Sequence, residues 1–312
     1  MKILCVITTA IALICLGSIT QANITIDTVK IGDARNVADK TTGYGRVNYE
    51  YNIGKYEVTA GQYTAFLNAV AKTDTYGLYN LNMSNGDQFK CQIAQTGTSG
   101  SYSYSVADAY ANRPVNYVSY WDSLRFINWL GNGQGSGSTE TGAYTLNGYN
   151  GTDGRTISRN AGATWALASE DEWYKAAYYK GGVYSQYANG TNIAPGMRTD
   201  SNYGSYNSIW DGTINGTLEQ NGTKDMMGNV WEWNEALIGD TNRSVRGGAF
   251  YCGLSTLAAS DRTGSGAPNL EDSTFGFRVV QVQAVPEPPA IVAACVMLLP
   301  FGLGKLRSLR KK

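Results

Sequence analysis

The alternation of apolar and polar positions near residue 50 predicts a strand that leads directly into a helix. Every second residue over 47–53 is apolar or aromatic: Val47, Tyr49, Tyr51 and Ile53. A period of two is typical of a half-buried strand. Thr59 and Gln62 then form a capping-box pattern, in which each side chain can bind a free backbone N–H. The apolar residues that follow share one helical face: Tyr63, Phe66, Leu67 and Val70.

The same combination of a cap and an apolar stripe predicts two further helices. One starts at Ser119, carries Asp122 in its first turn and ends at Gly131. Its apolar stripe has a spacing of three residues: Leu124, Ile127 and Leu130. The other starts at Ser169, where Glu172 completes a capping box, and we expect it to end at residues 181–182, a Gly-Gly pair.

Between these helices the chain is rich in turn residues. Residues 131–142 form a Gly/Ser/Thr loop, and residues 147–154 and 211–222 are dense in Asn-Gly and Asp-Gly signals. No fixed-period repeat emerges. A few helices among short strands and long loops predict an α+β fold, which we place in a single domain over residues 23–284.

The first 22 residues have the pattern of a secretory signal peptide. Lys2 precedes an apolar run from Ile3 to Ile19, and residues 20–22 end in a small residue that suits cleavage. We therefore expect signal peptidase to remove residues 1–22 and the rest of the chain to be exported.

Residues 285–312 combine three parts that parallel other processed C-terminal anchors. A Val-Pro-Glu-Pro motif over 285–288 comes first, an apolar stretch over 290–304 follows, and a basic tail ends the chain. A permanent span takes about 20 residues, so the apolar stretch is short, and a plain stop-transfer helix is the alternative. The segment resembles the PEP-CTERM signal, which in Gram-negative bacteria is recognised by an exosortase. The resemblance implies transient membrane anchoring before release to the periplasm, the outer surface or the extracellular matrix.

Composition excludes several classes of function. The chain has 25 basic and 25 acidic residues and no basic block outside the C-terminal tail, so nucleic-acid binding has no electrostatic support. Histidine is absent, which excludes Ser-His-Asp triads, Cys-His dyads and metal centres built on imidazole. With 37 glycines, 22 tyrosines and only 16% charged residues, the composition suits a loop-rich extracellular domain.

Two cysteines remain in the predicted domain. Cys5 and Cys15 leave with the signal peptide, and Cys295 lies in the C-terminal apolar stretch. Cys91 and Cys252 could form one disulfide in an oxidising compartment, but their distance in space does not follow from the sequence. A disulfide and two free thiols therefore both stay open.

Six segments resemble one family when they are taken in order. They are residues 54–59 (GKYEVT), 113–119 (RPVNYVS), 169–173 (SEDEW), 228–233 (GNVWEW), 246–249 (RGGA) and 276–279 (GFRV). Together they resemble the formylglycine-generating enzyme, or sulfatase-modifying factor, family over about residues 53–280. The resemblance implies a variant C-type-lectin-like fold of short twisted strands, helices and long loops. Most of these residues by themselves indicate caps, apolar anchors and tight turns, so function has to be argued from the site.

In the family's oxidases, two cysteines five positions apart follow the Gly-Gly turn and bind copper(I). Two thiolates suit this soft monovalent ion. Cys252 fits the first position, and Leu257 stands at the second. A lone Cys252 thiolate would need another activator, such as Arg246 or Arg262. We therefore expect a non-catalytic domain without copper, and the alternative is a copper-dependent oxidase that acts on a cysteine through Cys252, with Cys91 as an unusual second ligand.

The resemblance also implies a structural calcium ion in the loop that leads into the Trp-Glu-Trp segment. The matching ligands are the side chains of Asp225 and Glu232 and the backbone carbonyls of Gly228 and Val230. Hard oxygen ligands from alternate positions of a tight loop suit calcium. The alternative is that Asp225 caps a turn and Glu232 pairs with an arginine such as Arg246 or Arg278.

These observations predict a cell-surface or extracellular-matrix protein that binds saccharide, such as an exopolysaccharide, or another protein. Aromatic faces stack on sugar rings and amide side chains bond hydroxyls, which suits the tyrosines and the long Gly/Asn/Ser-rich loops. A glycosidase is a third interpretation, with paired carboxylates at residues 170–172 or at Glu232 and Glu235. Acidic residues at a helix cap usually interact with the helix dipole instead.

Overall fold

A computed structural model describes residues 23–84, 86–155, 157–204 and 208–282. The signal peptide at 1–22 and the sorting signal at 285–312, with its apolar stretch at 290–304, lie outside the described residues, so both stay predictions. Within the described ranges, no helix is long and apolar enough to cross a membrane.

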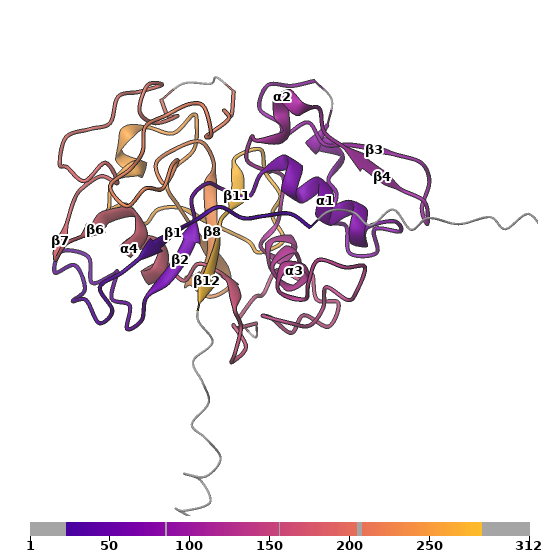
Figure 1. The fold of residues 1–312 in the computed structure, drawn as a ribbon, viewed down its shortest axis with the longest axis horizontal. Coiled ribbons are helices and arrows are strands. Elements are labelled where there is room, and N and C mark those ends of the chain that lie inside the picture. The colour runs from indigo at the N-terminus through magenta and orange to yellow at the C-terminus, as the bar shows by residue number, and fades with distance from the viewer. Residues whose placement is uncertain (1–22, 85, 156, 205–207, 283–312) are drawn as a thin grey trace, which may run out of the picture.

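One four-stranded sheet joins the beginning, the middle and the end of the domain. Its order is β1 (Thr28–Ile31), β2 (Tyr51–Gly54), β12 (Val279–Val282) and β5 (Trp165–Leu167), and every neighbouring pair is antiparallel. Val280 lies opposite Ile53 on one side and Ala166 on the other. The last described strand therefore occupies the interior of this sheet, next to the segment that leads into the first helix (Figure 1).

A second four-stranded sheet brings together three of the six segments that carried the family resemblance, those at 228–233, 246–249 and 276–279. Its order is β10 (Ser265–Gly266), β9 (Asn242–Arg246), β8 (Trp231–Ile238) and β11 (Phe275–Phe277). The pair β8–β11 is parallel, with Phe275 opposite Trp231 and Phe277 opposite Trp233. Two small hairpins complete the strands: β3 (Ala94–Thr96) with β4 (Ser103–Ser105), and β6 (Tyr179–Lys180) with β7 (Val183–Tyr184).

The three predicted helices form where their caps are. The helices α1 (Ala60–Val70), α3 (Tyr120–Gly131) and α4 (Glu170–Tyr178) each begin after a capping box, at Thr59, Ser119 and Ser169. Figure 1 shows α1 and α3 on one side of the sheets, and α4 with the β6–β7 hairpin on the other. Three short helices add to them: α2 (Asp108–Ala111) and the 3₁₀ turns η1 (Leu81–Met83) and η2 (Leu254–Leu257).

Two predicted boundaries were wrong. The strand predicted over 47–53 is regular only from Tyr51, because the backbone N–H of Val47 bonds the Asn36 side chain instead of a neighbouring strand. The third helix ends at Tyr178, before the Gly-Gly pair. Gly181 and Gly182, with φ of 59° and 89°, form the turn of the β6–β7 hairpin, a conformation that glycine adopts without steric cost.

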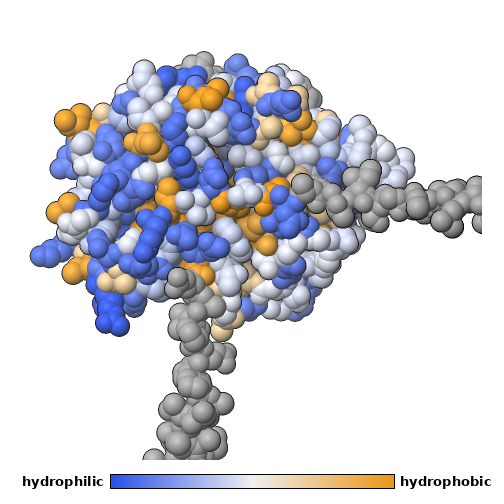
Figure 2. Space-filling model, viewed as in Figure 1, coloured by the Kyte–Doolittle hydropathy of each residue, from blue (hydrophilic) through white to orange (hydrophobic). Residues whose placement is uncertain are grey.

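The core is built largely from aromatic side chains. Neighbouring rings of one cluster have centroids 5.2 to 6.1 Å apart; its members are Tyr63, Phe66, Phe126, Trp129 and Phe277. The helix α3 passes through this core, and all its residues from Tyr120 to Leu130 are buried. Hydrophilic residues predominate on the face in Figure 2, where hydrophobic residues are scattered among them. This continuous core of buried aromatic side chains explains why a glycine-rich chain is ordered.

Candidate functional site

The Trp-Glu-Trp and Gly-Phe-Arg segments meet in a buried ion pair. Arg278 Nε lies 2.7 Å from Glu232 Oε2, and Arg278 Nη2 lies 2.6 Å from Oε1. Trp173 Nε1 donates a third hydrogen bond to Glu232 Oε2, at 2.7 Å. Both members of the pair are fully buried. Glu232 thus forms the pair with an arginine that was the alternative to calcium, and the bidentate geometry ties β8 to the residue between β11 and β12.

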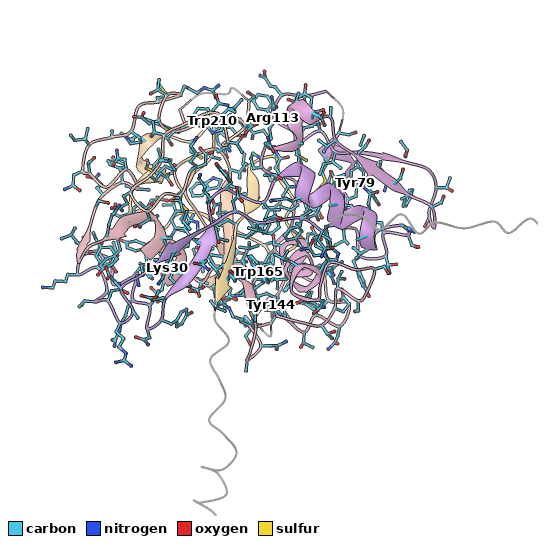
Figure 3. The ribbon with its side chains drawn as sticks, viewed as in Figure 1. Lys30, Tyr79, Arg113, Tyr144, Trp165 and Trp210 are labelled. Atoms are coloured by element: carbon cyan, nitrogen blue, oxygen red, sulfur yellow. The ribbon has the colours of Figure 1, made fainter. Side chains whose placement is uncertain are left out.

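Asp225, the other predicted calcium ligand, has a different environment. Its backbone is left-handed, with φ of 59°, and its Oδ1 accepts a hydrogen bond from Trp210 Nε1 at 2.9 Å; Trp210 is labelled in Figure 3. Its Oδ2 is buried without a hydrogen-bond partner among the described residues. Burial raises the pKa of Asp225 to about 7. An orphaned buried carboxylate oxygen fits a cation ligand, whereas the carboxylate of Glu232 is already paired.

The calcium loop is therefore only half suited to its expected ion. Gly228, with φ of 85°, donates its N–H to Gly247 O at 2.7 Å, and Val230 is fully buried. Among the described residues, no group of three or more His, Cys, Asp and Glu side chains is arranged to hold a metal ion. Calcium in this loop stays a prediction.

Two acidic residues that the sequence did not single out lie next to this loop. Glu57 Oε1 accepts a hydrogen bond from Asn229 Nδ2 at 3.1 Å, and burial followed by the charge of Asp225 raises its pKa. Glu219 Oε2 accepts hydrogen bonds from Thr223 Oγ1 and Met226 N, and burial raises its pKa to about 8. The only sequence signal for Glu57 was its place in the first family segment.

The inherited thiol position lies just beyond the turn at Gly247 and Gly248. Cys252 is buried, and its N–H donates to Ala249 O at 2.8 Å. Burial raises the pKa of its thiol, against smaller opposing contributions from hydrogen bonds with Thr256 and Trp231. Leu257, where a second copper thiolate would stand, is fully buried in η2. The position has thus become part of the apolar core.

Cys91, the unusual second ligand of the oxidase alternative, is a buried thiol beside two backbone carbonyls. Its Sγ lies 3.9 Å from both Met83 O and Asn116 O, and burial raises its pKa to about 11. Both Cys91 and Cys252 are free thiols, so the disulfide is not formed. The two thiols are not hydrogen-bonded to each other.

The two arginines considered as activators of Cys252 are already paired. Arg246 Nη2 lies 2.5 Å from Glu170 Oε1, and Arg262 Nη2 lies 2.6 Å from Glu170 Oε2. Both guanidinium groups also lie over the ring of Tyr44, at 5.4 and 4.9 Å from its centroid. Their charge is therefore directed at Glu170 and Tyr44, where it lowers the pKa of the Glu170 carboxyl despite burial.

Glu172 and Glu235, two of the carboxylates considered for a glycosidase, share an ion pair with one arginine. Arg159 Nη2 lies 2.7 Å from Glu172 Oε2 and 2.9 Å from Glu235 Oε2. Tyr49 and Tyr144 donate their hydroxyls to the same two carboxylates. Burial favours protonation of Glu172, but the hydrogen bonds and charge of Arg159 prevail and lower its pKa. Burial raises the pKa of Glu235, so the pKa shifts alone do not decide the hydrolase interpretation, but both carboxylates are engaged by Arg159 and a tyrosine hydroxyl.

A shallow aromatic cleft of 270 Å³ opens beside the Cys252 segment. It is lined by Phe89, Phe250, Tyr251 and residues 272–274. The rings of Phe89 and Phe250 are stacked, with centroids 5.3 Å apart. Asn116 joins the two walls, since its Nδ2 donates to Phe89 O at 2.6 Å and to Ser273 O at 2.5 Å.

Comparison with known proteins agrees with this geometry. Residues 27–283 match the model of the FGE-sulfatase family, described as the sulfatase-modifying factor enzyme 1-like domain. The solved structure of Treponema denticola variable protein 1 has a TM-score of 0.55 at 19% identity, over 81% of this chain and 94% of that chain. A crystal structure of CarF has a TM-score of 0.57 at 24% identity, over 82% of this chain and 98% of that chain.

At these identities the two solved structures share the fold and nothing further. No curated protein sequence gives a significant match. The family match spans nearly the whole described chain, and the fold places its segments around one buried centre. The chain therefore belongs to the FGE-sulfatase (sulfatase-modifying factor) family and has its α+β, C-type-lectin-like fold.

Proposed function

We propose that this protein is an exported, non-catalytic member of its family that binds saccharide or another protein at the cell surface or in the extracellular matrix. The proposed loss of catalysis rests on one observation. Leu257, which is fully buried, occupies the position where the second copper cysteine is expected. A linear copper(I) site takes two thiolates, and of the two family positions only the one at Cys252 offers a thiol.

The environment of Cys252 supports the same conclusion. A thiol with a raised pKa is protonated at neutral pH, and a protonated thiol is a poor nucleophile and a poor metal ligand. Arg246 and Arg262 pair with Glu170, so they do not lower that pKa. Neither copper binding nor thiol exchange is therefore favoured at this site.

Export and anchoring rest on the two ends of the sequence. The signal-peptide pattern makes signal peptidase a partner, and the Pro-Glu-Pro motif with its apolar and basic parts makes an exosortase a second one. Binding rests on the surface, where the long loops between short strands provide clefts lined by aromatic, amide and hydroxyl groups.

The test is a copper(I) titration of the purified protein and of Cys252→Ala, followed by oxygen uptake with a cysteine-containing peptide. We expect no Cys252-dependent binding tighter than that of a single thiol, and no oxygen uptake above the peptide alone. Tight binding that Cys252→Ala abolishes, together with turnover, would make this an oxidase with a remodelled site and would overturn the proposal.

A further inference from the structure

Three segments that are far apart in the sequence meet at a second, polar cleft. It has a volume of 330 Å³, within the usual range for small-molecule sites, and it lies between residues 39–42, the end of β7 and residues 259–260. Figure 1 shows the first of these loops beside β6 and β7, on the side of the sheets where α4 lies. Neither Cys252 nor any of the six segments that carried the resemblance is among its lining residues.

The acidic wall of the cleft is fixed before any ligand arrives. Tyr174 Oη donates to Asp39 Oδ2 at 2.6 Å and accepts from Thr42 Oγ1 at 2.9 Å. Asp39 Oδ1 accepts the N–H of Thr41 at 2.8 Å. Because Tyr174 belongs to α4, the carboxylate is held by the core as well as by its own loop. Such preorganisation lowers the entropic cost of binding.

The aromatic wall is fixed in the same way. The Tyr184 ring packs on Tyr179, with centroids 4.9 Å apart, and on Tyr174, at 5.7 Å. Its hydroxyl accepts from Asn36 Nδ2 at 2.8 Å and donates to Gly45 O at 3.0 Å. The half-buried ring therefore presents a rigid face beside Asp39.

The rim of the cleft carries unused hydrogen-bonding groups. Asn192 Oδ1 accepts the N–H of Gln186 at 2.9 Å, and Ala259 N–H donates to Gln186 O at 2.9 Å, so the rim segments are tied together. Asn192 Nδ2, Thr41 Oγ1 and Ser260 Oγ are on exposed residues and have no hydrogen-bond partner among the described residues.

Charge and polarity select the class of ligand. Asp39 is the only charged residue in the lining, which contains no cationic side chain and one aliphatic one, Ala259. Lys40 is exposed and is not part of the lining. Peptide partners are usually bound by apolar anchor pockets, and anions by cations, and this cleft has neither. Building on the binding role proposed above, we propose that it binds a neutral, hydroxyl-rich saccharide unit.

In this complex the sugar ring stacks on Tyr184, and its hydroxyls donate to Asp39 and exchange hydrogen bonds with Asn192 and Ser260. Planar carboxylate and amide groups beside an aromatic face suit adjacent sugar hydroxyls and the C–H face of a pyranose. An acidic sugar would bring its carboxylate to Asp39, and like charges repel in a partly desolvated cleft.

The test uses a matched pair of ligands and a matched pair of variants in isothermal titration calorimetry. The ligands are α-1,4-linked galactotriose and trigalacturonate, which differ in charge, with cellotriose and mannotriose to sample other neutral sugars. Ser260→Trp fills the cleft, and Ser255→Trp places the same side chain on an exposed serine outside it. Thermal unfolding of both variants verifies folding, and Asn192→Ala is a milder second probe.

We expect a neutral trisaccharide to bind, and its uronate counterpart to bind at least about tenfold more weakly. Ser260→Trp should abolish binding, Ser255→Trp should retain it, and Asn192→Ala should weaken it about fivefold, the effect of one hydrogen bond. Binding that survives Ser260→Trp would overturn the site but leave the binding role intact. Absence of binding to all three neutral sugars would overturn the saccharide assignment, while the copper and oxygen measurements decide the non-catalytic role separately.

Discussion

Two regions, the buried Glu232–Arg278 pair and the segment that follows the Gly247–Gly248 turn, differ sharply in how they use polar atoms. In the first region, Glu232 and Arg278 are fully buried and their charges are matched by a bidentate pair and by Trp173. After the turn, Cys252 is a lone buried thiol, and Leu257 adds only apolar packing. Removing a side chain from the first region would leave an unpaired charge in the core, whereas removing one from the second would alter only packing. The fold and the family's chemistry therefore depend on different residues.

The largest expected effect comes from breaking the ion pair. Arg278→Met should cost about 3–5 kcal/mol of unfolding free energy, because it leaves the Glu232 carboxylate buried and unpaired. Urea denaturation of the purified protein measures it. The double variant Arg278→Met with Glu232→Leu should recover much of the loss. A cost under about 1 kcal/mol for the single variant would mean that the two regions do not differ as described.

Restoring the second cysteine should have a smaller effect on stability and a clear effect on chemistry. Leu257→Cys removes buried volume and should cost about 1–3 kcal/mol. The two thiols should then bind one copper(I) ion that the natural chain does not bind tightly. Leu257→Ser is the matched control, because it makes a similar loss of volume without a thiol. Failure of Leu257→Cys to bind copper would show that the surrounding backbone has also left the oxidase geometry.

The buried acids next to the calcium loop predict a pH dependence. Burial raises the pKa of Glu219 to about 8, from about 4.3 in an unfolded chain. Folding therefore favours the protonated acid. This contribution is complete below about pH 4 and is lost as the pH rises through 8. Over pH 5–8 the natural protein should lose up to about 1.4 kcal/mol per pH unit relative to Glu219→Gln. If the unfolding free energies of the two proteins changed with pH in the same way, Glu219 would not be a neutral acid in the folded protein.

Calcium should produce the smallest shift. If the orphaned Asp225 Oδ2 binds the ion, millimolar calcium should raise the midpoint of thermal unfolding by a few degrees over EDTA, equivalent to about 1–2 kcal/mol. Asp225→Ala should remove the shift, and magnesium at the same concentration should not reproduce it. No shift in the natural protein would contradict a calcium ion at Asp225 and leave Glu232 with its partners Arg278 and Trp173.

The features that the sequence could predict are those decided within a few residues. The capping boxes at Thr59, Ser119 and Ser169 formed as expected, because a cap and its partner are three positions apart. The Gly-Gly pair at 181–182 also marks a turn, but local pattern could not distinguish the end of a helix from a hairpin. The deciding contacts were the backbone pairs between β6 and β7.

The partners of buried charges could not be predicted in this way. The sequence left Glu232 open between a calcium ligand and an arginine partner, and Arg278 is 46 residues away. The role of Arg159 was not foreseen, because it pairs with Glu172 and Glu235 only when β8 and α4 come together. The polar cleft was also beyond local reasoning, since Asp39, Tyr184 and Ser260 meet only in the folded chain.

The position of β12 has a consequence for the order of folding. This strand, at residues 279–282, separates β2 at residues 51–54 from β5 at residues 165–167. Until it is present, both neighbours expose unpaired backbone groups along one edge, and such edges are prone to aggregation and to recognition by proteases. The sheet can close only after the last part of the domain has emerged from the ribosome or the translocon. A chain truncated before residue 279 should therefore accumulate as degradation products rather than as a smaller folded domain.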